Sequence, residues 1–121
     1  MQDQVNNLTE KLWQIKEHWS PRVIAELNDY QFKLVKLQGE FVWHSHPDTD
    51  EAFFVLSGEM KILFRDREIS LSEGDLFIVP KGQEHKPLAD SECHVMLVEP
   101  RGVVNTGSIE SNFTAPNDVW I

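Results

Sequence analysis

Two histidines and a glutamate near the middle of the chain have the spacing of residues that act together. His44 and His46 are two positions apart, so on a strand both side chains point to the same face. A turn at Pro47 and Asp48 follows, and Glu51 then opens a further strand on which it can face both histidines. Imidazole and carboxylate groups that converge in this way are suited to binding a transition metal ion.

A second stretch adds a further imidazole. Gly74 precedes an apolar run that ends in a turn at Pro80 and Gly82, and His85 opens the strand after it. If this strand packs over the first, its histidine joins the other two. Phe53 lies two positions beyond the glutamate and points the same way, so we expect it to line the site and contact a substrate.

The two stretches resemble the two sequence motifs of the cupin superfamily. Residues 39–58 read G-x4-H-x-H-x4-E-x6-G, which is one residue shorter than the family's first motif between the first glycine and the first histidine. Residues 74–89 follow the second motif, G-x5-P-x-G-x2-H-x3-N, except that Ala89 replaces the asparagine, which is not a metal ligand in the family. The similarity extends over roughly 22–99 and is greatest to small single-domain cupins that are grouped with mannose-6-phosphate isomerases.

The resemblance implies an all-β fold, a double-stranded β-helix or jelly-roll barrel with one N-terminal helix. It also implies one divalent metal ion bound inside one end of the barrel by His44, His46, Glu51 and His85. Three imidazoles and one carboxylate suit Zn, Fe, Mn, Ni or Co, and disfavour Ca and Mg, which prefer oxygen ligands. An octahedral ion would keep two positions open for substrate oxygens or water.

Two further residues are candidates for roles beside the metal. His94 could point into the barrel as a general base, because histidine titrates near neutral pH, or it could point outward while its neighbours fill the core. Lys36 shares a strand face with Phe32 and Leu34 and could bind a substrate carboxylate, or it could reach solvent at a strand end.

The surrounding sequence predicts the elements that position these residues. Apolar residues at helical spacing predict a helix over 6–19, with Asn7 and Glu10 capping its start and Pro21 ending it: they are Leu8, Leu12, Ile15 and Trp19. Nine strands are expected, at 22–27, 30–38, 40–46, 51–57, 59–64, 67–71, 75–79, 85–88 and 93–99. Short strands without helices between them predict an antiparallel sandwich or barrel. We therefore divide the chain into an N-terminal helix over 1–20 that packs on the barrel or on a dimer partner, a cupin barrel over 22–99, and a C-terminal arm over 100–121.

The composition of the chain argues against some classes of binding partner. The 121-residue chain carries a net charge of −9, which argues against nucleic acid as a partner because such binding needs a basic face. It has no apolar run of about 18 residues for a membrane span and no signal-peptide pattern, so we expect a cytoplasmic protein. Four tryptophans need burial, which favours a homodimer; they are Trp13, Trp19, Trp43 and Trp120.

These features favour a small metalloenzyme that acts on a sugar phosphate, a sugar acid or another small carboxylate by isomerase or lyase chemistry. An iron-dependent dioxygenase is the enzymatic alternative, since a histidine-rich site with open positions also suits oxygen activation. A binding protein whose metal holds a small molecule without turnover is the alternative from a different class.

Overall fold

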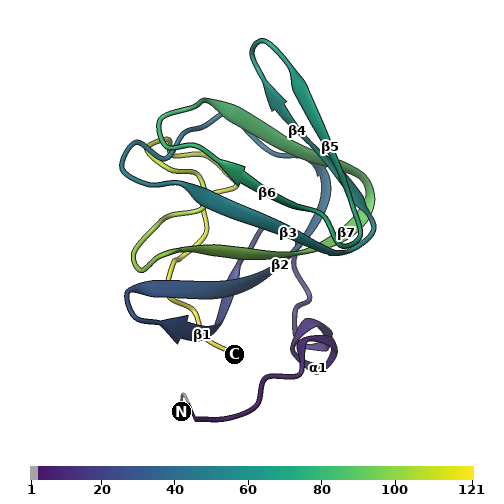
Figure 1. Ribbon diagram of the computed structural model, residues 1–121, viewed down its shortest axis with the longest axis vertical. Helices are drawn as coiled ribbons and strands as arrows, with labels where there is room; N and C mark the ends of the chain where they lie inside the picture. Colours follow the sequence, from purple (N-terminus) through teal and green to yellow (C-terminus); the bar gives the residue numbers. More distant parts are fainter. Residues whose placement is uncertain (1–2) are drawn as a thin grey trace.

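Alternation of apolar and polar residues builds the molecule from antiparallel strands. The structure, a computed structural model, describes residues 3–121 (Figure 1). Its elements are α1 (Leu8–Trp13), β1 (Arg22–Leu27), β2 (Tyr30–Glu40), β3 (Glu51–Ser57), β4 (Glu59–Phe64), β5 (Glu68–Ser72), β6 (Leu76–Val79) and β7 (His85–Pro100). No helix among these described residues is long and apolar enough to cross a membrane.

The long strand β7 connects the two parts of the sheet. Its start pairs with β4, while its later residues lie between β2 and β3, giving the strand order β1-β2-β7-β3-β6 with β5 beyond β4. Exposed residues 90–92 mark the bend between the two halves of β7. Figure 1 shows the strands curving around a common interior, which confirms the predicted all-β jelly-roll barrel with one N-terminal helix.

The interior of the barrel is filled by every second residue of these strands. Phe53 and Val55 on β3 and Val95 and Leu97 on β7 belong to the main core cluster. A second, smaller cluster lies on the outer face of the sheet, where α1 packs over β1 and β2 around Leu34. Burial of alternate side chains on two faces of one sheet therefore accounts for both clusters.

The predicted helix over 6–19 is too long. Asn7 caps α1 as expected, with its Oδ1 accepting a hydrogen bond from the backbone nitrogen of Glu10 at 3.0 Å, but the helix ends at Trp13. Ile15 packs in the outer cluster, whereas Trp19 adopts a left-handed φ of 61° and packs in the barrel core. Two apolar residues at helical spacing thus belong to different cores, and tertiary packing overrides the periodicity.

The strand boundaries also differ from the prediction in two places. Residues 41–46 form no strand, and their only pairing within the described chain is a single bridge between His44 and His85. The predicted strands 85–88 and 93–99 are two halves of the continuous β7. Residues 101–121 form an arm without helix or strand that returns to β1, where Trp120 bridges Val23 (Figure 1).

Candidate metal centre

The structure brings His44, His46, Glu51 and His85 together inside one end of the barrel. Glu51 is the first residue of β3 and His85 the first of β7, while both other histidines lie on the segment between β2 and β3. All four side chains are buried, with exposed fractions of 5% or less. One ligand atom from each residue lies within 4.8 Å of those of the others, so this group could hold a metal ion.

Backbone hydrogen bonds fix the segment that carries the first two histidines. The backbone nitrogen of His44 donates to the carbonyl oxygen of His85 at 3.0 Å, and the nitrogen of His85 donates back at 2.9 Å. The nitrogen of Gly82 donates to the carbonyl oxygen of His46 at 2.9 Å. These bonds hold the segment to the start of β7, so its irregular backbone still places the imidazoles accurately.

Hydrogen bonds to carbonyl oxygens orient two of the imidazole rings. Nδ1 of His44 lies 2.9 Å from the carbonyl oxygen of Val42, and Nδ1 of His85 lies 2.9 Å from that of Gln83. With Nδ1 as the donor, the lone pair of each ring is on Nε2, which is the arrangement that metal-binding histidines use.

Several buried atoms of this group have no hydrogen-bond partner in the described structure. They are Nε2 of His46, Nε2 of His85 and Oε1 of Glu51. The two nitrogens lie 3.3 Å and 3.6 Å from that oxygen. Buried polar atoms without partners are rare and costly, so converging lone pairs fit a bound cation. The donor set therefore suits the group that the family implies.

The protonation states also suit a cation. Burial lowers the pKa of His44 to about 4, and the nearby His85 contributes to this shift. Burial alone would raise the pKa of Glu51, but contacts with His46 and His85 hold it well below its usual range. Neutral imidazole and ionised carboxylate are the forms that bind metals.

A buried ion pair lies behind Glu51. Nζ of Lys33 donates to Oε2 of Glu99 at 2.6 Å, and both side chains are at most 4% exposed. The antiparallel pairing of β3 with β7 sets Ala52 opposite Val98 and so brings Glu51 beside Glu99. Burial and this neighbouring carboxyl raise the pKa of Glu99 well above its usual range, although Lys33 opposes the shift. Sequence reasoning missed this pair. The alternation of side chains along the strand could have revealed the inward position of Glu99, because it lies on the same strand face as the inward-pointing Val95.

A small apolar cavity adjoins the ligands. Its volume is about 30 Å³, enough for one or two water molecules. His44 and Glu51 reach it, and most of its wall is apolar: Trp19, Val35, Leu37, Phe41, Phe53 and Leu97. Within the described part of the chain, no lysine or arginine lines this cavity. Phe53 lines this cavity, and its contact with a substrate stays a prediction.

The C-terminal arm packs against the ligand segment. A Cβ atom on Gly107, which has a left-handed φ of 63°, would lie 2.0 Å from the carbonyl oxygen of Ser45, between two ligand histidines. Asn105 lines the cavity, and its side-chain nitrogen donates to the carbonyl oxygens of Trp19 at 3.0 Å and Phe113 at 2.8 Å. The arm is therefore part of the wall that encloses the centre.

The two other candidate residues are not brought to the centre. Nε2 of His94 lies 2.9 Å from Oε1 of Glu92, and Nζ of Lys36 donates to the carbonyl oxygen of Ile15 at 2.9 Å. His94 alternates with buried Cys93 and Val95 along β7, so the pleat of the strand turns it to the outer face. We therefore correct two predictions: His94 is not placed to act as a general base at the centre, and Lys36 is not placed to bind a substrate carboxylate there.

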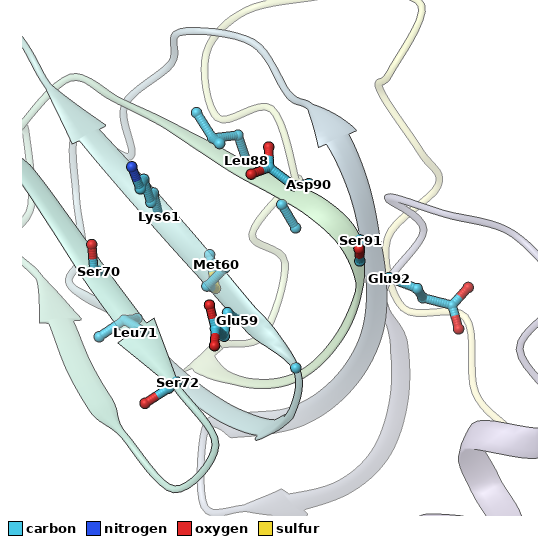
Figure 2. A pocket seen from close by; sticks show the side chains of 12 residues that line it. Glu59, Met60, Lys61, Ser70, Leu71, Ser72, Leu88, Asp90, Ser91 and Glu92 are labelled. Carbon is cyan, nitrogen blue, oxygen red and sulfur yellow. The ribbon is translucent and has the colours of Figure 1, made fainter.

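A larger surface groove lies away from these ligands. It has a volume of about 580 Å³ and is bounded by residues 58–61, 70–72 and 88–92. Figure 2 shows its side chains along β4, β5 and the bend of β7, with Lys61 and Asp90 among them. None of the four clustered residues lines it, so size alone does not locate the candidate centre.

Comparison with known proteins agrees with this architecture. A family model described as a cupin domain matches residues 33–99. Protein YdbB of Bacillus subtilis (strain 168) is 42% identical over 74 residues, which are 60% of this chain and 66% of YdbB, so the match spans just under two-thirds of that relative.

Two solved structures are similar over most of the chain. A cupin-2 domain containing protein from Shewanella frigidimarina NCIMB 400 has 58% identity and a TM-score of 0.79, over 80% of this chain and 95% of that one. Protein NMB1881 from Neisseria meningitidis has 35% identity and a TM-score of 0.75, over 80% of this chain and 99% of that one. Together with the matched family model and the geometry of the barrel, these similarities show that the chain belongs to the cupin domain family.

Proposed function

We propose that this protein is a metal-dependent oxygenase, in which His44, His46, Glu51 and His85 hold one divalent transition metal ion. The observation that carries the proposal is the mainly apolar wall of the cavity beside these residues, in which no lysine or arginine of the described chain takes part. A wall of this kind suits a small, weakly polar molecule that reaches the metal through an oxygen atom.

The same wall gives less support to a sugar phosphate or sugar acid as substrate. An anion in an apolar cavity needs a cationic partner, and Lys33, which is buried in the barrel, is already paired with Glu99. Lys36 lies on the outer face. The net charge of −9 also disfavours an anionic substrate.

The groups around the cavity bear on the type of reaction. His44 and Glu51 are the titratable residues among the described residues that line it, and both are candidate ligands. Isomerase and lyase reactions need a separate acid or base to move a proton. Dioxygenation needs no such group: both atoms of O2 enter the substrate, which supplies all four electrons, and a bound iron would supply the redox chemistry.

The test begins with the metal content of protein purified without a nickel column. Protein loaded anaerobically with Fe(II) is then exposed to O2 with a panel of small phenols and enediols, and with sugar phosphates as a comparison panel. We expect O2 consumption that depends on a weakly polar substrate and is lost in His46→Ala. Protein that takes up no transition metal, or that converts sugar phosphates without consuming O2, would contradict the proposal.

A non-catalytic binding protein is the second candidate, because His94 and Lys36 point away from the centre and, among the described residues, the candidate ligands His44 and Glu51 are the titratable groups that line the cavity. A ligand that raises the thermal unfolding temperature of the metal-loaded protein, with no turnover in air, would support this candidate.

The homodimer also stays a prediction. Trp13 on α1 is 72% exposed, and Leu76 and Ile78 on the sheet-edge strand β6 are exposed as well. Exposed large apolar side chains of this kind favour a partner that covers them. Light scattering coupled to size-exclusion chromatography measures the oligomeric state directly.

A further inference from the structure

The pair Lys33 and Glu99 is unusual for the place it occupies. Both side chains point into the barrel, and Val35 and Leu97, which lie two positions away on the same strands, are buried and apolar. Their charged atoms are 2.6 Å apart, and Nζ of Lys33 also donates to the carbonyl oxygen of Val103 at 3.2 Å. The pair therefore joins β2, β7 and the start of the C-terminal arm.

Stability alone does not account for such a pair. Removing two charges from water costs more than their attraction generally returns, and apolar replacements of similar volume are often as stable or more stable. The barrel already offers apolar neighbours to such replacements, so the pair calls for a role other than stabilisation.

The neighbour of Glu99 indicates that role. Ala52 on β3 lies opposite Val98 on β7, so Glu51 and Glu99 lie side by side on these two strands, and both carboxyls are buried. Oε1 of Glu99 is buried without a protein donor in the described residues. Lys33 is thus hydrogen-bonded to Glu99, and Glu99 is the cross-strand neighbour of Glu51, whose Oε1 lies 3.3 Å from Nε2 of His46.

We propose that Lys33 and Glu99 are positioning residues, which hold the Glu51 carboxylate in the orientation that a metal ion needs. Glu99 limits the rotation of the Glu51 carboxyl, and Lys33 fixes Glu99 from the other side. Because Lys33 is also bonded to Val103, the same contacts hold the start of the arm that packs on the segment between His44 and His46. Partners behind metal ligands commonly change metal affinity roughly 10–100-fold.

The inference rests on the proposed metal centre, and cobalt tests it without an activity assay. The double variant Lys33→Met/Glu99→Leu removes both charges and keeps the side-chain volume. The control is Lys61→Met/Glu68→Leu, which removes an exposed ion pair of 3.1 Å between β4 and β5. Each protein is stripped of metal, unfolded with urea, and separately titrated with Co(II) while its visible absorption spectrum is recorded.

We expect the double variant to unfold, without metal, at a urea concentration no lower than the wild type does. Its affinity for Co(II) falls roughly 10–100-fold and its cobalt spectrum changes, because Glu51 is no longer held. The control keeps the affinity and spectrum of the wild type. A double variant with wild-type affinity and spectrum would overturn the inference and leave the proposed function standing.

Two further outcomes are decisive. If the double variant does not fold without metal, Glu99→Gln, which keeps the size of the side chain, takes its place, and an unchanged cobalt spectrum in that variant overturns the inference. A wild-type protein that binds no cobalt would overturn the metal centre itself, and this inference with it.

Discussion

The molecule contains two clusters in which a glutamate lies between two histidines. Glu51 lies between His46 and His85 in the barrel, at nitrogen–oxygen distances of 3.3 Å and 3.6 Å. Glu92, at the bend of β7, lies between His18 and His94 on the surface, at 2.8 Å and 2.9 Å. The residue types are the same, but the surface contacts are complete hydrogen bonds and the buried ones are not.

The difference shows what makes a candidate metal centre. In the surface cluster each nitrogen already has an oxygen partner, and the side chains are between 26% and 42% exposed to water. In the buried cluster the facing atoms have no partner within the described chain, and a fourth residue, His44, points at the same spot. Converging buried atoms without partners, rather than histidine and glutamate as such, therefore distinguish the cluster that could hold a cation.

The largest expected effect is on metal content, which should fall when the buried cluster is mutated and stay unchanged when the surface cluster is mutated. His46→Ala removes a ligand with no available replacement, so metal affinity should fall by more than the roughly 100-fold that outer contacts can cost. His94→Ala should retain stoichiometric metal. Elemental analysis of both proteins, purified without a nickel column, is the measurement; equal metal in the two variants would contradict the assignment of the buried cluster.

The second effect concerns pH. In the folded protein without metal, the pKa of His44 is about 4, which is below its usual value of 6.5. As the pH falls, the imidazole of His44 is therefore protonated in the unfolded chain before it is protonated in the folded protein. The His44 contribution to the free energy of unfolding is therefore present above pH 6.5. It is lost as the pH falls towards 4, by on the order of 3 kcal/mol.

Urea unfolding of wild type and His44→Asn across this range isolates the contribution. Glu99 has a raised pKa and acts in the opposite direction, but it is present in both proteins and cancels in the difference. A difference curve between wild type and His44→Asn that is flat from pH 6.5 to 4 would contradict the burial of His44.

The third effect tests the arm that covers only the buried cluster. Gly107→Ala would place a methyl group 2.0 Å from the carbonyl oxygen of Ser45, so the arm must move away from the ligand segment. Gly102→Ala is the matched control, since Gly102 also has a left-handed φ, of 92°, but open space around its Cβ position. We expect Gly107→Ala to be less stable than the control by about 2 kcal/mol in urea unfolding. Equal losses would show that the arm does not press on the centre.

Sequence patterns were sufficient where the information is local. The period of two along each strand predicts which residues point inward, and the spacing of His44, His46, Glu51 and His85 is a local pattern in two short stretches. The structure brings those four residues together. The strand positions, apart from residues 41–46, follow from the same alternation.

Sequence patterns were insufficient where residues far apart in the chain meet. Lys33 and Glu99 are ordinary charged residues until the pairing of β2 with β7 buries them beside Glu51. The contact of Gly107 with Ser45 joins an irregular arm to an irregular segment, so no periodic pattern in the sequence predicts it. Trp19 has helical spacing but a left-handed backbone, because its ring stacks on Phe41 at 4.6 Å in the barrel.

The smallest expected effect concerns the surface cluster alone. Hydrogen bonds from His18 and His94 lower the pKa of Glu92 to about 2, so its contribution to stability is present above the usual pKa of 4.5 and is lost as the pH falls through 2. Glu92→Gln should cost less than about 1 kcal/mol at neutral pH and nothing below pH 2, because solvent and salt screen exposed pairs. Urea unfolding at low and high salt measures this loss. A loss of stability that does not depend on salt and is as large as that expected for His44 would mean that the surface cluster is as shielded from water as the buried one. The two clusters would then differ only in the fourth candidate ligand, His44.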